Sequence, residues 1–281
     1  MVDLRKLIAQ ANSLAPLPTS TVRLAGMSSD SNCHLDEIAG LVEFDQALTV
    51  RLLRAANSAF SASAMPVSTV GEAVARMGTQ QVMELAVAAG VSRILQAPIA
   101  GYGLDEGALW RHSVAAAVST EIARDFCQVE VPPESFTAAL LHDIGKLVMG
   151  RYLSPDILGF IRRAQEVDHL DQLAAESLLL FVHHGELGGL MAQHWKLPPR
   201  IVLGIIHHHT PALGRDAICD VTYLANQLAK HVEAGLAGRT FEGTLDAGVV
   251  ERLGLPPDAL EHMGPLASER FVKVSSRYNV L

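Results

Sequence analysis

Cysteine is scarce in this chain, and the few cysteines are scattered. Cys33, Cys127 and Cys219 are the three cysteines among 281 residues. An odd number of isolated cysteines provides neither a disulfide framework nor a Cys-x-x-Cys metal clip. We therefore interpret them as buried thiols of a protein in a reducing cytosol.

Basic clusters and long apolar runs are also lacking. The formal net charge is -8 and the pI is about 5.8, with no basic run along the chain. Nucleic acid is not an expected partner, because neutralising phosphates requires clustered Lys and Arg. No stretch approaches the roughly 18 to 20 apolar residues that cross a bilayer, and the N-terminus lacks the apolar run of a signal peptide. We expect no membrane partner and a cytoplasmic location.

Alternating β-type patterns are nearly absent, whereas apolar residues recur at helical spacing in a chain that is 49% hydrophobic. This pattern predicts an all-α fold. Thr69 and Glu72 have the spacing of a capping box, which predicts a helix that ends near Gly78. A longer apolar helix is predicted from Thr79 to about Leu95.

Helix breakers are concentrated in residues 97–103, which contain one proline and two glycines. We predict two helical lobes, residues 1–100 and 101–281, that pack closely because the connector is short. The first lobe has no cluster of residues with obvious chemistry. Its best candidates for polar contacts, more simply explained as exposed or capping residues, are Arg51, Arg54 and Asn57.

The second lobe is predicted to contain four main helices. The first covers about residues 110–126, and the second follows Pro132 and Pro133 and covers about residues 136–148. A longer helix is expected over about residues 170–195. Pro198 and Pro199 then fit the first turn of a helix that ends at Thr210 and Pro211.

Histidines of this lobe fall at unusual positions among the twelve in the chain. His142 and Asp143 lie in a strongly apolar segment, where an unpaired carboxylate is costly to bury. His208 and His209 continue the apolar rows of their helix. His112 lies just before an apolar stripe, and His184 precedes the small pair Gly188-Gly189, which would let another backbone approach.

These residues form one candidate metal site. Neutral imidazole nitrogens suit zinc, iron, nickel or manganese, and a carboxylate can bridge two ions. A lone histidine on an apolar helix is more often a core residue bonded to a carbonyl, but the convergence of several favours one or two divalent ions. The candidate ligands are His112, His142, Asp143, His184, His208 and His209.

The motifs of this lobe resemble those of a known superfamily. The segment Leu140-Leu141-His142-Asp143-Ile144-Gly145-Lys146 resembles the signature of the HD metal-dependent phosphohydrolases, and the order of the candidate ligands is similar to that of its two-metal branch. More narrowly, the chain resembles the HDOD family of HD-related output domains in bacterial signalling proteins. The segments that carry this narrower resemblance are 14–18, 45–49, 52–58, Glu176 with 184–188, and 195–198.

The resemblance implies an HD-like helical bundle and a site chemistry. In a working HD enzyme, the metals lower the pKa of a bound water so that hydroxide attacks phosphorus. Asp143 would serve this reaction as a ligand, and Lys146 would neutralise charge on the phosphate. The alternative for Lys146 is a solvated lysine near a helix end. His183 and His207 precede assigned ligands and are expected to face elsewhere.

Two departures from the family pattern bear on function. Catalytic HD proteins contribute a further aspartate from a later helix, where this chain has Asn226, and Asp220 is too far away along the helix to replace it. Residues 210–212 read Thr-Pro-Ala, without the Gly-Tyr-Pro element of cyclic-dinucleotide phosphodiesterases. Cleavage of cyclic di-GMP is therefore not expected.

Three functional classes remain open. The favoured one is a bacterial signal-transduction module with an HD-like divalent-metal site that binds a signalling protein or a small phosphorylated ligand. The second is an active phosphohydrolase that acts on a nucleotide or another small phosphate ester. The third is a structural adaptor whose site holds no metal.

Overall fold

The computed structural model describes residues 4–14, 16–27, 35–43, 45–59, 66–167, 170 and 172–278. Within these residues the chain is helical, and its only β contact is an isolated bridge between Ile99 and Leu104. The predicted all-α class is confirmed. No described helix combines the length and apolarity needed to cross a lipid bilayer. Cys219 is buried and Cys127 is half-buried, while Cys33 lies outside the described residues.

The N-terminal helices follow the sequence pattern closely. Thr69 accepts a hydrogen bond from the Glu72 backbone N–H, and the Glu72 carboxylate accepts one from the Thr69 N–H, so the predicted capping box is formed. Gly78, with φ +81°, separates the helix that ends at Met77 from the helix that begins at Thr79. The helices are α1 (Leu4–Ser13), α2 (Thr19–Met27), α3 (Leu35–Glu43), α4 (Gln46–Ala59), α5 (Val70–Met77) and α6 (Thr79–Leu95).

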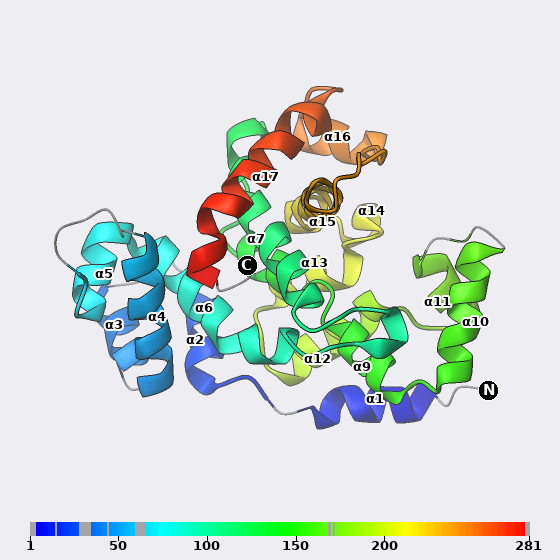
Figure 1. The fold of residues 1–281 in the computed structure, drawn as a ribbon, viewed down its shortest axis with the longest axis horizontal. Coiled ribbons are helices and arrows are strands. Elements are labelled where there is room, and N and C mark those ends of the chain that lie inside the picture. The colour runs from blue at the N-terminus through cyan, green and yellow to red at the C-terminus, as the bar shows by residue number, and fades with distance from the viewer. Residues whose placement is uncertain are drawn as a thin grey trace.

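Among the C-terminal helices, α8, α15 and α17 pack against α7, whereas α10 and α11 lie apart from it at the right of Figure 1. A short 3-10 turn, η1 (Ala100–Tyr102), precedes the C-terminal helices. Their bounds are α7 (Ala108–Phe126), α8 (Ser135–Leu141), α9 (Gly145–Tyr152), α10 (Pro155–Glu166), α11 (Gln172–Leu180), α12 (His184–His194), α13 (Pro199–His207), α14 (Pro211–Gly214), α15 (Ala217–Leu236), α16 (Ala247–Leu253) and α17 (Ala259–Tyr278).

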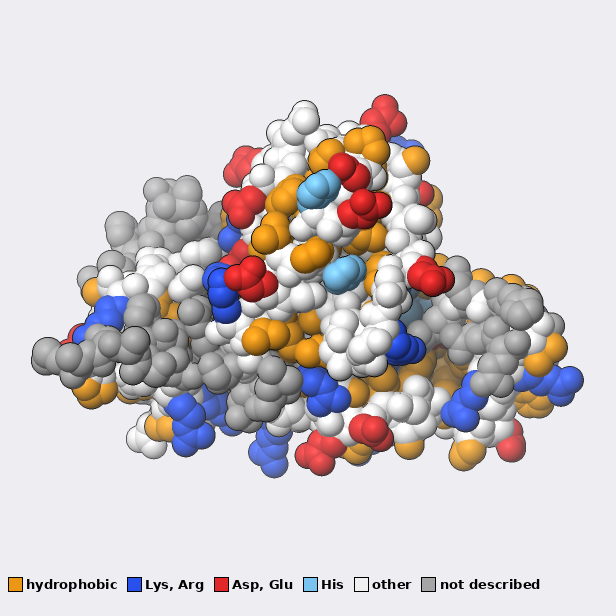
Figure 2. All heavy atoms as spheres, turned by 45° about the horizontal axis from the view of Figure 1, so that its top comes forward, with side chains coloured by type: hydrophobic (Ala, Val, Ile, Leu, Met, Phe, Trp, Pro, Cys, Tyr) orange, Lys and Arg blue, Asp and Glu red, His pale blue; other side chains and the backbone are white. Residues whose placement is uncertain are grey.

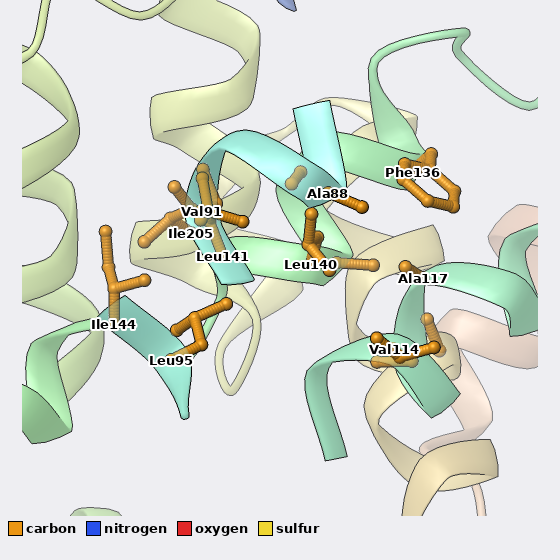
Figure 3. Close-up of a cluster of buried hydrophobic side chains, with 14 of the residues drawn as sticks. Ala88, Val91, Leu95, Val114, Ala117, Phe136, Leu140, Leu141, Ile144 and Ile205 are labelled. Atoms are coloured by element: carbon orange, nitrogen blue, oxygen red, sulfur yellow. The ribbon is translucent and has the colours of Figure 1, made fainter. Parts of the chain in front are cut away.

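The two lobes share one apolar seam. Ala88, Val91 and Leu95 of α6 lie in the same buried cluster as Leu140 and Leu141 of α8 (Figure 3). The terminal helices also cross between lobes, because α17 packs against α4 and α6, and α1 packs against α9 and α12. The lobes are closely packed, as expected, while a boundary at residue 100 stays a prediction.

The prediction of one helix over residues 136–148 is wrong in one respect. The structure has two helices there, α8 and α9, with a turn between them. The backbone N–H of Ile144 donates to the Leu141 carbonyl and that of Lys146 to the Asp143 carbonyl, both at the three-residue spacing of a tightened turn. Gly145 allows this turn to pack closely against α12. A Cβ there would lie 1.8 Å from the His184 carbonyl oxygen, so the turn presses directly on the backbone of α12.

The long helix predicted over residues 170–195 is also wrong, because it consists of α11 and α12. Phe181 between them has φ +58°, which an α-helix does not allow. The chain restarts where carboxylates accept the first free N–H groups: Glu186 accepts from His183 and Glu176 accepts from His184. Two acids, the buried Glu176 and the exposed Glu186, thus fix the start of α12.

The polar candidates of the first lobe have structural roles. Arg51 donates to the Ala89 carbonyl at 2.6 Å. The Asn57 amide both donates to and accepts from the backbone of Val67. Arg54 is exposed. The simpler explanation for these residues is therefore the better one.

Candidate metal centre

Four segments of the C-terminal lobe bring the six candidate ligands together. His112 lies in the second turn of α7, and His142 and Asp143 form the turn between α8 and α9. His184 is the first residue of α12, and His208 and His209 directly follow α13. All but His209 are less than 9% exposed. The break between α8 and α9 is therefore the feature that presents both His142 and Asp143 to the other helices.

The six residues form two triads of ligand atoms. His112, His142 and Asp143 make the His112 triad; His184, His208 and His209 make the His184 triad. Within each triad the ligand atoms lie within 4.8 Å of one another. Each triad has the size of a first coordination shell.

The Asp143 carboxylate lies between the two triads. Its Oδ2 is 3.6 Å from His112 Nε2 and 3.4 Å from His142 Nε2. Its Oδ1 is 3.2 Å from His184 Nε2 and 3.7 Å from His208 Nε2. One carboxylate therefore presents one oxygen to each triad, which is the arrangement of a carboxylate that bridges two metal ions.

The outer nitrogens of these rings are anchored. Nδ1 of His142 lies 2.7 Å from the Ala139 carbonyl, and Nδ1 of His208 lies 2.7 Å from the Ile205 carbonyl. A carbonyl oxygen only accepts, so each Nδ1 carries the proton and each Nε2 presents a lone pair inward. Burial lowers the pKa of His142 to about 3 and that of His208 well below its usual range, which keeps both rings neutral.

The inward-facing nitrogens fit a metal ion. His142 Nε2 is 3.2 Å from His112 Nε2, and His208 Nε2 is 3.3 Å from His184 Nε2. The lone pairs of His142 Nε2 and His208 Nε2 therefore each face another imidazole nitrogen at a distance that a proton or a metal ion can bridge. Asp143 Oδ1 is buried and accepts no hydrogen bond of good geometry from the described residues. The donor set of imidazoles and one carboxylate suits divalent zinc, iron, manganese or nickel.

Asp143 is held as an anion. Its burial alone would raise its pKa, but Lys146, at 2.5 Å from Oδ2, and the neighbouring imidazoles outweigh this effect and hold the pKa well below the usual range. A cationic environment thus surrounds the bridging carboxylate even without a metal.

His184 is oriented by a second, fully buried carboxylate. Nδ1 of His184 lies 2.7 Å from Glu176 Oε2, and the Tyr102 hydroxyl and the Gln172 amide donate to Oε1 of the same carboxylate. Burial lowers the pKa of His184, but Glu176 and Asp143 outweigh it, so its pKa is raised. A carboxylate behind a ligating histidine fixes the ring and increases its basicity.

His112 has an equivalent partner that the sequence interpretation missed. Glu233 Oε1 lies 3.1 Å from His112 Nδ1, and its side chain is 43% exposed. Burial opposes ionisation of Glu233, but the contact with His112 lowers its pKa below the ordinary value. Glu233 lies seven residues after Asn226 on α15, two helical turns on the same face, and that spacing was the available signal.

A cavity of about 430 Å³ opens beside both triads. His112, Asp143 and His209 line it, together with Lys146 and Lys230. Anionic ligand atoms that enter this cavity would meet two ammonium groups next to the bridging carboxylate. The volume falls within the range of small-molecule sites.

Asn226 lines the same cavity, and its Oδ1 is buried without a hydrogen-bond partner among the described residues. Asp220 points elsewhere, because it forms an ion pair with Arg252 at 2.6 Å. His183 and His207 belong to neither triad; His183 Nε2 lies 3.7 Å from Glu186. The expectations for these neighbours of the ligands therefore agree with the structure.

A model of the HDOD domain matches residues 14–211 of the chain. The chain belongs to the HDOD family. An uncharacterised protein of Treponema pallidum (strain Nichols) is 24% identical over 199 residues, which are 70% of this chain and 38% of that protein. The chain thus spans well under half the length of this curated relative.

Solved structures share the fold. An HDOD domain protein of unknown function from Geobacter sulfurreducens is 21% identical, with a TM-score of 0.72 over 97% of this chain and 98% of its own. A protein from Shewanella amazonensis SB2B, provisionally named a phosphohydrolase, is 23% identical, with a TM-score of 0.71 over 98% and 97%. A protein from Marinobacter aquaeolei VT8, provisionally named a signal transduction protein, is 23% identical, with a TM-score of 0.75 over 99% and 65%.

Proposed function

We propose that this protein is a bacterial signal-transduction protein whose HD-like core holds two divalent metal positions and binds a small phosphorylated ligand beside them. The observation that carries the proposal is the Asp143 carboxylate, which presents one oxygen to each histidine triad. Family membership and the provisional names of structural relatives support the regulatory role. We place the protein in the cytoplasm, where a second signalling protein would read its ligand-bound state.

The residues of the chain divide the work of such a site. The imidazole Nε2 atoms and Asp143 would hold the ions, while Glu176 and Glu233 orient the rings of His184 and His112. When bound, a divalent ion polarises phosphoryl oxygens and can lower the pKa of a coordinated water. Lys146 and Lys230 on the cavity wall would attract the phosphate of the ligand.

The side chains of the surface are consistent with a small ligand. On the face in Figure 2, the described basic side chains are interspersed with acidic ones and form no continuous stripe. The chain carries 22 basic and 30 acidic residues in total. We therefore assign the phosphate to the two lysines that line the cavity, Lys146 and Lys230.

A phosphohydrolase is the second candidate, and one observation favours it. Lys146 lies beside the bridging carboxylate and lines the open cavity, so a phosphate ester could contact both the ions and an ammonium group. Asn226 favours the regulatory proposal, because an amide oxygen is a weaker ligand than the carboxylate of catalytic HD proteins.

Metal analysis of protein purified without chelator tests the proposal. We expect one to two divalent ions per chain, loss of metal in Asp143→Ala and no more than one remaining ion in His142→Ala, with folding intact by circular dichroism. Metal-free wild-type protein that takes up neither manganese, iron, zinc nor nickel would contradict the proposal and indicate a structural adaptor.

A screen of nucleotides and other phosphate esters, with manganese or iron supplied, separates the two candidates. Binding without turnover supports the regulatory protein. Hydrolysis that disappears in both His142→Ala and Asp143→Ala, with the fold retained, would establish the enzyme.

A further inference from the structure

We propose that the two metal positions are unequal, and that Lys146 occupies the place of the second cation at the His112 triad until an anionic ligand draws it away. The inference rests on the proposed function, since it concerns the same site. It adds a regulatory property: the second ion and the phosphorylated ligand bind cooperatively.

The two oxygens of Asp143 have different surroundings. Oδ2, which faces His112 and His142, receives the Lys146 ammonium at 2.5 Å. Oδ1, which faces the His184 triad, accepts no hydrogen bond of good geometry from the described residues. The two oxygens thus differ in kind: Oδ2 is paired with a lysine that a metal ion would have to displace. Oδ1 faces imidazoles, with His184 Nε2 at 3.2 Å, and a metal ion there replaces only a proton between ligands.

The number of available ligands also differs between the two triads, and it too favours the His184 triad. The His184 triad offers three imidazoles in addition to Oδ1, whereas the His112 triad offers two imidazoles in addition to Oδ2. Asn226, whose buried Oδ1 has no hydrogen-bond partner in the part of the chain that the structure describes, lines the cavity with His112 and can supply only a neutral ligand. A divalent ion at the His112 triad would thus have fewer ligands and would have to displace Lys146.

Lys146 is positioned so that its ammonium group can move from Asp143 into the cavity. Its side chain is 15% exposed and lines the cavity, on a flexible stem at the start of α9. A phosphate in the cavity offers several oxygens to an ammonium group, so hydrogen bonds to the phosphate can replace the ion pair between Lys146 and Asp143. The freed Oδ2 and the added negative charge would then both favour a second cation.

Manganese titration of chelator-treated protein, followed by calorimetry and elemental analysis, tests the inequality. We expect wild-type protein to bind one ion tightly and a second at least about tenfold more weakly, as for loss of a charged hydrogen bond. Lys146→Met should bring the second dissociation constant toward the first by about tenfold. Lys146→Arg keeps the charge and should stay close to wild type, and Lys230→Met controls for the loss of one positive charge from the cavity.

Two ligand variants assign the ions to the triads. His208→Gln should abolish the tight ion, whereas His142→Gln should abolish the weak ion and leave the tight one. The reverse assignment, or equal affinities in wild type with no change in Lys146→Met, would overturn the inference while leaving the metal centre of the proposed function intact. A wild-type protein that binds no metal would overturn both.

Inorganic phosphate serves as the probe for the ligand. In wild type, millimolar phosphate should tighten the second manganese ion by about tenfold, and in Lys146→Met the effect should shrink because the lysine no longer has to be displaced. A phosphate effect of equal size in both proteins would show that Lys146 does not couple the two ligands.

Discussion

Both lobes of the molecule are built from α-helices, but they bury different kinds of side chain. Among the described residues up to 100, the buried polar side chains are Thr21 and Glu84. The second lobe buries many more, and those that concern the site are His112, His142, Asp143, Glu176, His184, His208 and Asn226. Because burying a polar group without a partner is costly, the first lobe reads as apolar packing and the second as a site whose polar groups compensate one another.

Glycine use separates the lobes in the same way. A Cβ at Gly40, in α3, would meet no described atom within 4 Å. At Gly145 it would lie 1.8 Å from the His184 carbonyl, and at Gly188 it would lie 3.2 Å from the Gly145 backbone nitrogen. Gly185, also in α12, would place a Cβ 3.0 Å from the Ile206 carbonyl oxygen, whereas a Cβ at Gly90 in the first lobe would meet only the Thr21 side chain. Among the described glycines, close approach to another backbone thus occurs where α12 meets α9 and α13.

The largest expected effect is on metal binding, from the one acid that both triads share. Asp143→Asn should weaken binding at both positions by about 100-fold or more, since each ion loses its charged ligand. Glu84→Gln changes the buried acid of the first lobe in the same way and should leave metal content unchanged. Calorimetric titration with manganese measures both. An Asp143→Asn protein that still binds two ions tightly would remove the basis for the contrast between the lobes.

The second prediction concerns backbone approach. Gly145→Ala should lower the free energy of unfolding by about 3 kcal/mol or more, because the new methyl group meets backbone atoms that cannot move aside. Gly40→Ala should change it by no more than about 1 kcal/mol, in the stabilising direction. Urea denaturation of the metal-free proteins measures both changes, and equal effects would mean that α9 and α12 are not tightly packed.

Much of this architecture was predictable, for physical reasons that differ between elements. The capping box at Thr69 and the glycine at Gly78 are local signals, so the bounds of α5 and α6 followed from the sequence. Apolar patterns also indicated His142, Asp143, His208 and His209, whereas His112 and His184 were proposed from their places before an apolar stripe and a glycine pair. Apolar periodicity gave no warning of the breaks at His142 and Phe181. The first lies where Gly145 contacts the backbone of His184, 39 residues later, and the second is accompanied by a hydrogen bond from the His184 N–H to Glu176 that apolar spacing does not reveal.

The supporting shell of the site was harder to predict. Glu233 lies 91 residues after His142, the second imidazole of the His112 triad. In the sequence it looks like an ordinary surface acid, and only the packing of α15 on α7 brings it to His112. Glu176 was noticed only through family resemblance, although its carboxylate binds both the backbone and the ring of His184. Tertiary packing, and not local pattern, gives these acids their role.

The third prediction compares these two supporting acids. Glu176→Gln should weaken binding at the His184 triad by about 10- to 100-fold, the usual effect of removing a partner behind a ligating histidine. Glu233→Gln should have a smaller effect, at the low end of that range, because its side chain is 43% exposed and water can replace it. Manganese titration of each variant decides the order. If Glu233→Gln proves the more damaging, the His112 triad is the better ordered of the two.

The smallest expected effect concerns the charge state of Glu84, the buried acid among the described residues of the first lobe. Burial is the main cause that raises the pKa of Glu84 to about 7, against the opposing effects of Gln80 and Arg124. Between pH 4.5 and 7 the unfolded chain loses this proton while the folded chain keeps it, so this residue makes the protein less stable as the pH rises.

Glu84→Gln removes that dependence. Relative to wild type, its free energy of unfolding should be higher at pH 8 than at pH 5 by on the order of 1–3 kcal/mol, measured by urea denaturation of metal-free protein. Because all other titrating groups are common to both proteins, their contributions cancel in this difference. An identical difference at both pH values would show that Glu84 is ionised throughout, like Asp143, and that the seam between the lobes is as polar as the metal centre.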